Sequence, residues 1–347
     1  MKAVVVREPG DVDSMQFIDV PIPKIGPKNL LIKIASSGVC YHDVLVRKGV
    51  IKHGVQMPLI LGHEIAGTIV DVGSDAGGFK SGDRVATTQR YHICGHCHHC
   101  RTNHEPLCEE KKFLGDYGMF GGYAEYVSVE HDNVALIPEG VGFDDAAVTA
   151  CTIGSVYNAL RDVGNVKIGE TVLITGASGG LGTQAVQIAR AQGAWVIAQT
   201  SAPEKAAMLE ELGGHKIVVH GRGEPFSDQI LKLTGGVGVD VVLDNIGTPV
   251  FESVRRSLRT GGRWISVGQL TGDFVQFNPA QLILKNISLL TATSTTRLQL
   301  EQCLQLVKRG MVKPTIAQIL PLDRARHAHD LMAQAKITGR IILRPEA

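Results

Sequence analysis

Four cysteines crowd into one short stretch of the chain. The stretch reads CGHCHHCRTNHEPLC, with the spacing C-x2-C-x2-C-x7-C, and its cysteines are Cys94, Cys97, Cys100 and Cys108. Four thiolates at this spacing on a turn-rich loop can close a tetrahedral shell around one Zn²⁺ ion. A closed shell leaves no position for substrate, so we interpret residues 94–108 as a structural zinc lobe. A four-cysteine iron-sulfur cluster is the main alternative, and disulfides are a weaker one because adjacent C-x2-C pairs make poor bridges.

A glycine-rich loop indicates a nucleotide-binding turn. GASGGLG directly follows the strand-like run TVLIT and precedes the helical pattern TQAVQIARAQG. Glycines permit a tight turn and the close approach of a pyrophosphate, and the helix N-terminus offers free N–H groups to phosphates. A plain strand-to-helix turn is the alternative, but the strand-turn-helix context favours dinucleotide binding. The residues expected to meet the cofactor here are Gly176, Ser178, Gly179, Gly180 and Leu181.

The end of the next strand distinguishes the two nicotinamide cofactors. An NAD-specific site usually places an Asp or Glu there, whereas a 2'-phosphate favours hydroxyls and a cation. Here the strand AWVIAQT ends in Gln199 and Thr200, followed by Ser201 and then Lys205. This pattern favours NADP(H) over NAD(H). The alternative is that Thr200 and Ser201 only cap the following helix.

A second group of metal-binding residue types is scattered along the chain. GVCYHD supplies Cys40 and Asp43, LGHEIAG supplies His63 and Glu64, and VTACTIG supplies Cys151. Two thiolates and one imidazole would leave Zn²⁺ an open position, as a catalytic zinc requires, and Asp43 could orient His63. Such a zinc polarises a carbonyl oxygen or lowers the pKa of a bound alcohol. Taken singly, however, a cysteine in an apolar run is more often part of a core.

Composition and charge exclude several classes of partner. The 347 residues are 44% hydrophobic and 20% charged, which suffices for two domains with sizeable cores. A net charge of +1 provides no long-range attraction for nucleic acid or for an anionic membrane. No apolar stretch approaches the roughly 18 residues of a membrane span, and the start MKAVVVREPG indicates a strand and not a signal peptide. With seven cysteines and no export signal, we expect a small-molecule substrate and a cytoplasmic location.

Two regions with different sequence patterns must position these residues. Up to residue 151, Gly- and Pro-rich turns separate short β-rich runs such as LLIKIA, which is typical of an irregular β-barrel. From residue 152, β-branched runs alternate with helical patterns such as APEKAAMLEELG and PVFESVRRSLRTGG, which predicts a parallel, doubly wound sheet. The predicted strands are TVLIT, AWVIAQT, KIVVH, VDVVLDN, GRWISVG and ISLLTAT. Beyond residue 294, the helix LQLEQCLQLVKRG and the strand TGRIILRP are expected to return to the first region.

The motifs, in this order, resemble those of the zinc-containing medium-chain dehydrogenase/reductase family, the alcohol dehydrogenases, over essentially the whole chain. The resemblance implies an α/β fold class, with a GroES-like β-barrel catalytic domain over residues 1–151 and 288–347. It also implies a doubly wound Rossmann nucleotide-binding domain over residues 152–287. By the same match, the catalytic zinc ligands would be Cys40, His63 and Cys151, with Glu64 close by as an occasional fourth.

The resemblance further implies cofactor contacts and an assembly. The nicotinamide would lie near Asn245 and Gly247 of LDNIG and near Val267 and Gly268 of SVG, and Arg340 of GRIIL would meet the pyrophosphate. Members of the family are dimers or tetramers that commonly pair through the last Rossmann strand, here ISLLTAT. We therefore expect a homodimer or homotetramer.

Departures from the family pattern bear on the reaction. Alcohol dehydrogenases usually carry Ser or Thr two residues after the first zinc ligand, at the start of a proton relay, and that position is His42 here. An imidazole of near-neutral pKa could itself move the proton. The glycine loop is similar to those of quinone and enoyl reductases. The C-Y-H-D motif is also similar to that of acryloyl-CoA reductases, which saturate a C=C bond with NADPH.

We therefore predict a zinc-dependent alcohol dehydrogenase that transfers a hydride between NADP(H) and an alcohol/aldehyde or ketone pair. It would hold one structural and one catalytic Zn²⁺ per chain, with His42, Asp43 and Glu64 in the catalytic machinery. The leading alternative is NADPH-dependent reduction of an activated C=C bond, as in an enoyl-CoA. A non-catalytic NADPH-binding sensor is disfavoured because all three candidate ligands are retained.

Overall fold

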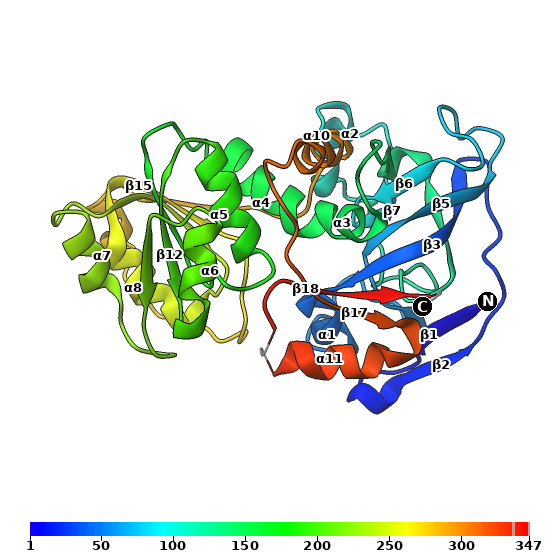
Figure 1. Ribbon diagram of the computed structural model, residues 1–347, viewed down its shortest axis with the longest axis horizontal. Helices are drawn as coiled ribbons and strands as arrows, with labels where there is room; N and C mark the ends of the chain where they lie inside the picture. Colours follow the sequence, from blue (N-terminus) through cyan, green and yellow to red (C-terminus); the bar gives the residue numbers. More distant parts are fainter. Residues whose placement is uncertain (335–336, 346–347) are drawn as a thin grey trace. The chain divides into compact units, whose positions relative to one another are not determined.

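The two regions with different sequence patterns fold into two separate units. The computed structural model describes residues 1–334 and 337–345. The first unit is built from Met1–Gly154, Ser294–Gly310 and Pro314–Ala347, and the second from Ser155–Thr293 and Met311–Lys313. In Figure 1, segments from the two ends of the chain, coloured blue and red, come together in the first unit.

The second unit is a parallel sheet of the doubly wound type. Its order is β13-β12-β11-β14-β15-β16, with every neighbouring pair parallel, which is the 3-2-1-4-5-6 order of dinucleotide-binding folds. The predicted strands are confirmed as β11 (Thr171–Ile174), β12 (Trp195–Thr200), β13 (Lys216–Val219), β14 (Val239–Asp244), β15 (Leu258–Ser266) and β16 (Ser288–Thr291). The helices between them are α5 (Gly182–Ala191), α6 (Ala206–Glu211), α7 (Ser227–Leu233), α8 (Phe251–Ser257) and α9 (Ala280–Ile283). Figure 1 shows α5 and α6 on one side of this sheet and α7 and α8 on the other.

Two boundaries in the second unit differ from the sequence prediction. The helical pattern PVFESVRRSLRTGG ends as a helix at Ser257, because Leu258 already pairs with β14 as the first residue of β15. The domain boundary expected at residue 287 would leave out β16, which pairs with β15 at the edge of the sheet, and the unit continues to Thr293. The strand ISLLTAT was predicted for the parallel sheet, so the boundary at residue 287 fell one strand too early.

The first unit is built around β-sheets that take strands from both ends of the chain. The larger sheet has the order β10-β6-β5-β3-β18-β17, with β9 also paired to β3. Because β18 pairs with β3, the predicted return of the chain to this region is confirmed. The smaller sheets are β2-β1-β4 and β7-β8. The strands are β1 (Lys2–Val6), β2 (Met15–Asp19), β3 (Asn29–Val39), β4 (Leu59–Ile60), β5 (Glu64–Val72), β6 (Arg84–Thr87), β7 (Arg90–His92), β8 (Lys112–Phe113), β9 (Tyr126–Glu130), β10 (Val134–Leu136), β17 (Ile316–Pro321) and β18 (Arg340–Arg344).

Short helices connect and cover these sheets. The α-helices outside the parallel sheet are α1 (Tyr41–Arg47), α2 (His98–Arg101), α3 (Phe143–Val148), α4 (Ser155–Tyr157), α10 (Arg297–Lys308) and α11 (Ala325–Ala333). Two π-helical segments, η4 (Thr149–Gly154) and η5 (Asn158–Val163), flank α4. Single 3-10 turns are η1 (Val12–Ser14), η2 (Glu105–Leu107), η3 (His131–Asn133), η6 (Pro203–Lys205), η7 (Thr248–Val250) and η8 (Leu322–Arg324). Within the described residues, no helix is both long enough and apolar enough to cross a membrane.

One apolar core of the first unit joins helices that are distant in sequence. Val44 of α1 packs in the same cluster as Ala325, Ala328 and Met332 of α11. The spacing of three and four residues places these α11 side chains on one face of the helix. This packing brings α11 against the helix that begins beside Cys40.

Candidate active site and structural metal site

The four cysteines of the zinc lobe converge in the structure. Their sulfur atoms all lie within 4.8 Å of one another, and Cys94 Sγ is 3.9 Å from Cys100 Sγ. Donor atoms on one Zn²⁺ ion lie roughly 3 to 4 Å apart, because each Zn–S bond is about 2.3 Å long. All seven cysteines of the chain are free of disulfides. The lobe therefore fits a four-thiolate zinc site.

Backbone amides favour the thiolate form in this lobe. The amide of Cys97 donates to Cys94 Sγ at 3.3 Å, and the amide of Cys94 donates to Cys108 Sγ at 3.5 Å. Hydrogen bonds from the backbone of Cys97 and His96 lower the pKa of Cys94 to about 6, whereas burial raises the pKa of Cys100. A bound cation would supply the positive charge that the remaining thiols need in order to ionise.

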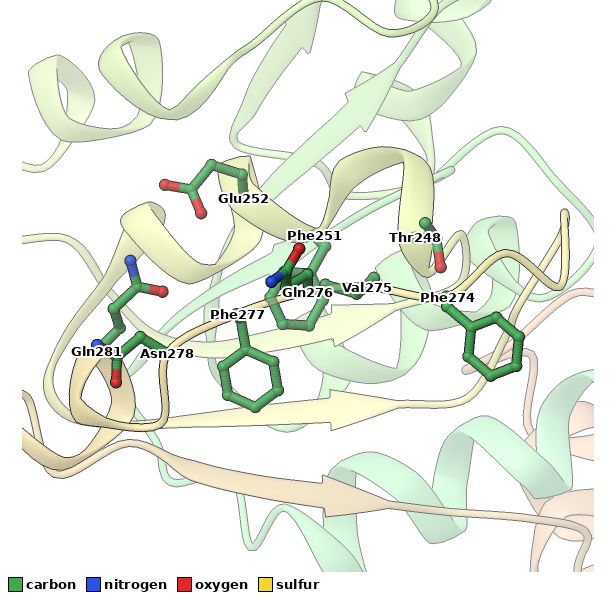
Figure 2. A pocket seen from close by; sticks show the side chains of 9 residues that line it. All are labelled: Thr248, Phe251, Glu252, Phe274, Val275, Gln276, Phe277, Asn278 and Gln281. Atoms are coloured by element: carbon green, nitrogen blue, oxygen red, sulfur yellow. The ribbon is translucent and has the colours of Figure 1, made fainter.

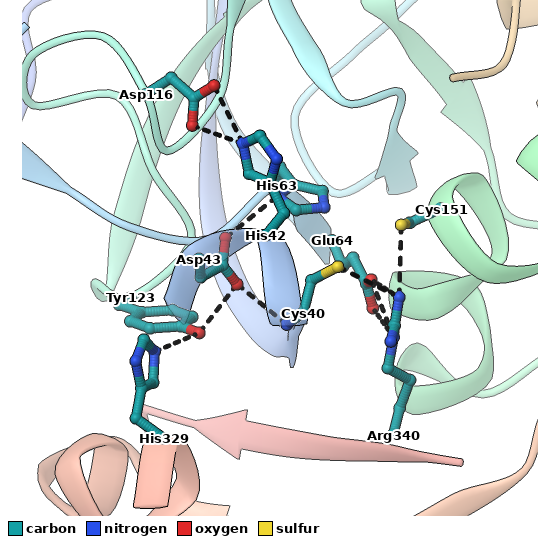
Figure 3. A network of polar contacts seen from close by, with 10 residues as sticks. All are labelled: Cys40, His42, Asp43, His63, Glu64, Asp116, Tyr123, Cys151, His329 and Arg340. Atoms are coloured by element: carbon teal, nitrogen blue, oxygen red, sulfur yellow. Dashed lines mark hydrogen bonds and ion pairs between the residues drawn. The ribbon is translucent and has the colours of Figure 1, made fainter. Parts of the chain in front are cut away.

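The second predicted group of metal-binding residues also comes together. Candidate ligand atoms of Cys40, His63, Glu64 and Cys151 all lie within 4.8 Å of one another, and all four side chains are buried. Figure 3 shows these side chains converging from separate elements of the first unit. Two soft thiols and one imidazole suit Zn²⁺. The donor set therefore fits a zinc ion with one position left for substrate or for Glu64.

The pairing of β3 with β5 and a separate π-helical segment position these donors. Glu64 begins β5 and lies opposite Gly38 of β3. A Cβ atom at Gly38 would lie 2.1 Å from Glu64 Oε2 and 2.9 Å from Glu64 Cβ, so a side chain here would displace the buried Glu64 carboxylate. Cys40 directly follows β3, and His63 directly precedes β5. Cys151 is carried by η4, and short π-helical segments are frequent at functional sites.

Asp43 holds the ring of His63 in one orientation. The amide of Cys40 donates to Asp43 Oδ2 at 2.9 Å, which closes the first turn of α1, and Asp43 Oδ1 lies 3.1 Å from His63 Nδ1. Burial alone would raise the pKa of Asp43, but the charge and hydrogen bond of His63 outweigh it and lower that pKa. An imidazole that donates from Nδ1 keeps its Nε2 lone pair for a metal. The expected role of Asp43 is therefore supported by the geometry.

Arg340 lies in the same buried cluster. Its Nε donates to Glu64 Oε1 at 3.0 Å, and its Nη2 lies 3.3 Å from Cys40 Sγ and 3.4 Å from Cys151 Sγ. Burial raises the pKa of Glu64 although Arg340 opposes the shift, while the hydrogen bond from Cys151, together with Arg340, lowers the pKa of Cys40. The expected contact of Arg340 with the cofactor pyrophosphate stays a prediction.

His42 has a carboxylate partner that the sequence did not reveal. Its Nε2 lies 2.9 Å from Asp116 Oδ1 and 3.0 Å from Oδ2. The His42 ring is 5.3 Å from the ring of His63 and 5.3 Å from that of Phe113, measured between centroids. Burial alone would lower the pKa of His42, but the hydrogen bond and charge of Asp116 raise it. Because Asp116 follows in a turn-rich loop 74 positions later, no local motif marks this pair.

The glycine loop has the geometry expected for close approach to phosphates. Gly176 adopts a φ of +57°, and a Cβ atom at Gly182 would lie 2.3 Å from the carbonyl oxygen of Gly176. The remaining loop residues predicted to meet the cofactor lead directly into α5, with Gly179 exposed and Ser178, Gly180 and Leu181 partly exposed. The loop thus matches the sequence prediction in conformation.

The end of β12 is tied to this loop. Gln199 is buried and accepts a hydrogen bond from the amide of Gly176 at 2.9 Å, and Thr200 Oγ1 lies 2.9 Å from Ser178 Oγ. Ser201 is exposed, and Lys205 ends the 3-10 turn η6 that follows. Thr200 Oγ1 also accepts from the amide of Ala202 at 3.2 Å, but the N-cap residues of η6 and α6 are Ala202 and Lys205, so neither Thr200 nor Ser201 caps the following helix.

The predicted nicotinamide residues lie at the carboxyl ends of β14 and β15. The amides of Val267 and Gly268 both donate to the carbonyl of Asp244, and a Cβ atom at Gly268 would lie 2.4 Å from the carbonyl oxygen of Asn245. Gly247 takes a φ of +83° beside them. Among residues 1–334 and 337–345, no group donates a hydrogen bond to the buried Oδ1 of Asn245. This unsatisfied acceptor fits a ligand that carries an amide N–H, as nicotinamide does.

A hollow on the second unit lies apart from these residues. It has a volume of about 660 Å³ and is lined by Thr248, Phe251 and the loop around Phe274 and Phe277. Figure 2 shows the aromatic rings beside the hollow. None of the residues predicted to bind metal or cofactor lines it.

Comparisons with known proteins agree with both units. The sequence profile of the alcohol dehydrogenase GroES-like domain matches residues 26–139, and that of the zinc-binding dehydrogenases matches residues 180–309. An alcohol dehydrogenase of Geobacillus stearothermophilus is 35% identical over 344 residues, which cover 99% of each chain.

Two further relatives widen the comparison. An acryloyl-coenzyme A reductase of Sulfurisphaera tokodaii is 32% identical over 346 residues, which cover 99% of this chain and all of the reductase. The crystal structure of AibC superimposes with a TM-score of 0.94 at 38% identity and covers 100% of this chain and 96% of that one. The similarity therefore extends through both units.

Proposed function

Because the chain belongs to the zinc-containing medium-chain dehydrogenase/reductase family, we propose that it interconverts an alcohol and its aldehyde or ketone with NADP(H) as the hydride carrier. Membership of this family makes the chain an NAD(P)-dependent zinc oxidoreductase. The choice of substrate and of NADP(H) is our proposal. The observation that carries it is the convergence of Cys40, His63 and Cys151.

The residues of this cluster have distinct roles in the proposed reaction. When bound there, Zn²⁺ supplies a Lewis acid for a carbonyl oxygen, and NADPH supplies the hydride. Cys40, His63 and Cys151 would hold the metal, and Asp43 keeps the protonated nitrogen of His63 turned away from it. Glu64 and Arg340 form a buried ion pair beside the thiols, in which the positive charge of Arg340 favours the thiolate form and the carboxylate of Glu64 opposes it.

His42 is our candidate for proton transfer at the substrate oxygen. Its side chain is 28% exposed, so its ring borders both the buried cluster and solvent. Asp116 orients the ring through Nε2 and would act as a positioning residue. This arrangement would replace the hydroxyl that begins the proton relay in most alcohol dehydrogenases.

The preference for NADP(H) is supported by the end of β12. In place of an acidic residue, Thr200 joins Ser178 of the glycine loop there, with the exposed Ser201 next to it. Hydroxyls and a cation suit a 2'-phosphate, and Lys205 lies at the end of the turn that follows.

The test is product analysis after the purified protein is incubated with NADPH and cinnamaldehyde, which offers a C=O and a conjugated C=C bond to the same hydride. Cinnamyl alcohol as the product supports the alcohol dehydrogenase assignment. Hydrocinnamaldehyde as the product contradicts it and supports reduction of an activated C=C bond. Cys151→Ala is the matched control, because a product that depends on the metal cluster must disappear in this variant.

Reduction of an enoyl thioester is the second candidate function. It is favoured by the similarity to two acryloyl-coenzyme A reductases, of Sulfurisphaera tokodaii and Metallosphaera sedula, each 32% identical over nearly the whole chain. The same cofactor site would serve this reaction. Oxidation of NADPH by acryloyl-CoA, with no reaction toward aldehydes or ketones, would establish it.

The proposed assembly is a homodimer or homotetramer that pairs through β16. This strand is the edge of the parallel sheet, so its outer backbone groups have no strand partner within the unit. The strand itself and the segment of about 20 residues before it carry exposed apolar side chains, namely Leu270, Phe274, Ile283, Leu284 and Leu289. A second copy of the chain would bury these side chains and extend the sheet. We propose the cytoplasm as the location, since thiols that serve metals suit a reducing compartment.

A further inference from the structure

A chain of buried hydrogen bonds leads away from the candidate zinc site toward α11. The hydroxyl of Tyr123 lies 3.0 Å from Asp43 Oδ2 and 3.2 Å from His329 Nε2. On the far side of that ring, Arg47 Nε lies 3.2 Å from His329 Nδ1. Figure 3 shows Tyr123 and His329 lined up behind Asp43 and His63. The side chains of Tyr123, His329 and Arg47 are all buried.

The donors and acceptors in this chain can be assigned from Arg47. A guanidinium only donates, so His329 Nδ1 must accept, and the neutral ring then carries its proton on Nε2. His329 Nε2–H therefore donates to the oxygen of Tyr123, whose own O–H is left to donate to Asp43 Oδ2. Arg47 is itself held by the carbonyl of Gly10, to which Nη1 donates at 2.8 Å.

The protonation states of His329 and Tyr123 agree with these donor and acceptor assignments. Burial lowers the pKa of His329 to about 4, and the positive charge of Arg47 acts in the same sense, so the ring is neutral near pH 7. Burial and the Asp43 carboxylate raise the pKa of Tyr123 well above its ordinary value, so its O–H stays protonated. His329 and Tyr123 therefore each donate one hydrogen bond and accept another, between Arg47 as the donor at one end and Asp43 as the acceptor at the other.

These hydrogen bonds determine how the Asp43 carboxylate is oriented. Its Oδ2 receives the Tyr123 hydroxyl and the amide of Cys40, which leaves Oδ1 for Nδ1–H of His63. We propose that Arg47, His329 and Tyr123 are positioning residues that fix the Asp43 carboxylate and thereby present the Nε2 lone pair of His63 to Zn²⁺. This inference rests on the proposed metal site at Cys40, His63 and Cys151.

The hydrogen-bonded side chains come from distant parts of the sequence and meet only in the folded protein. Tyr123 and His329 lie 206 positions apart, and Arg47 and His329 lie 282 positions apart. An apolar core would need no polar groups here, and a buried donor without a partner destabilises the folded state. The metal affinity should therefore depend on how α11 docks against α1.

The experiment measures zinc affinity by competition with a chelator series, with zinc counted per chain by elemental analysis. Tyr123→Phe removes the donor to Asp43, and His329→Leu removes both contacts of the ring. Each should weaken zinc binding at the Cys40, His63 and Cys151 site by roughly 10- to 100-fold, as loss of outer hydrogen bonds to metal ligands does. His329→Gln should retain most of the affinity, because its oxygen can accept from Arg47 and its nitrogen can donate to Tyr123.

Controls separate positioning from general destabilisation. Tyr126 is the first residue of β9 and lies three positions after Tyr123. Tyr126→Phe should leave the zinc affinity unchanged. All variants should keep the zinc of the four-cysteine lobe. A Co²⁺-substituted Tyr123→Phe protein should show an altered visible spectrum, since the spectrum reports ligand geometry at the metal. Unchanged zinc affinity in both Tyr123→Phe and His329→Leu would overturn the inference, as would equal losses in His329→Leu and His329→Gln. If Cys151→Ala removes no zinc, the proposed metal site fails and the inference fails with it.

Discussion

The hydroxyl of Ser178 in the glycine loop lies 2.9 Å from Oγ1 of Thr200 at the end of β12. This contact joins the two segments that, in a dinucleotide-binding fold, face the pyrophosphate and the adenosine ribose. The hydroxyl of the glycine loop and the hydroxyl at the end of β12 are thus neighbours in the folded protein before any cofactor binds. The neighbouring Lys205 then becomes the residue on which cofactor choice is most easily tested.

Replacing Lys205 with Gln should weaken NADPH binding about tenfold and leave NADH binding nearly unchanged. The physical reason is that a hydrogen bond to a charged phosphate contributes about 1.5 to 3 kcal/mol, whereas the ribose hydroxyl of NADH offers no such charge. Fluorescence titration with each cofactor gives the two dissociation constants. Lys232→Gln, at an exposed position of α7, is the control. Equal effects on both cofactors would contradict the role of Lys205.

Replacing Cys97 with Ser should remove about one zinc ion per chain and lower the melting temperature, because four thiolates hold the lobe closed. Zinc analysis and thermal unfolding measure the two effects. Cys303→Ala is the control, since Cys303 is a buried cysteine of α10 that does not belong to the group of four lobe cysteines. An unchanged zinc content in Cys97→Ser would rule out a structural zinc at this position.

Replacing Cys151 with Ala should remove a second zinc ion and reduce turnover by several orders of magnitude, while NADPH binding persists. Cys151 belongs to the first unit and the glycine loop to the second, so the loss of one donor leaves the loop intact. Steady-state kinetics and cofactor titration check both halves of the prediction. Retained activity would mean that the metal is held elsewhere.

Stability should fall between pH 6.5 and pH 4 in a way that depends on His329. The pKa of this residue is about 4 in the folded protein and 6.5 in its ordinary state, so in this interval only the unfolded chain takes up the proton. The contribution is fully present above pH 6.5 and is lost as the pH falls through about 4, by about 3 kcal/mol at roughly 1.4 kcal/mol per pKa unit. Denaturant midpoints of the wild-type and His329→Gln proteins give the difference. The same pH slope in both proteins would refute the prediction.

Replacing Leu289 with Asp should convert the proposed homodimer or homotetramer into smaller species. Leu289 lies on the edge strand β16 and is 47% exposed, so a buried carboxylate would oppose pairing with a second copy. Sedimentation velocity measures the change in mass. Val237→Asp, at another exposed apolar position of the second unit, should leave the mass as it is. An unchanged mass in Leu289→Asp would contradict pairing through β16.

The sequence predicted the elements with strong local patterns. The six strands of the parallel sheet were recognised because each is a β-branched run between turns or helices, and the glycine loop because its residues are contiguous. The start of β15 was missed because Leu258 continues a helical pattern, and only its pairing with β14 shows that it is a strand.

The partners of the site residues were harder to predict. Asp116 contacts His42, whereas Tyr123 and His329 each contact two side chains, and all of these partners are distant in the sequence. In the sequence, Tyr123 looks like a core aromatic, and His329 lies on a helix without any motif around it. Their roles depend on tertiary contacts that no spacing rule describes. The spacing of the lobe cysteines was enough to suggest a metal site, but the candidate ligands Cys40, His63 and Cys151 were assigned through the family resemblance, since each cysteine alone is compatible with a core residue.

The pairing of β18 with β3 has a consequence for the order of events during synthesis. Domains generally fold as units while the ribosome releases the chain from its N-terminus. The cluster of Cys40, His63 and Cys151 acquires Arg340 only when β18 reaches β3, after the whole second unit has emerged. The four lobe cysteines all lie between residues 94 and 108, so their site does not depend on any later part of the chain. A nascent chain stalled before residue 314 should therefore be able to take up lobe zinc while its catalytic pocket is still incomplete.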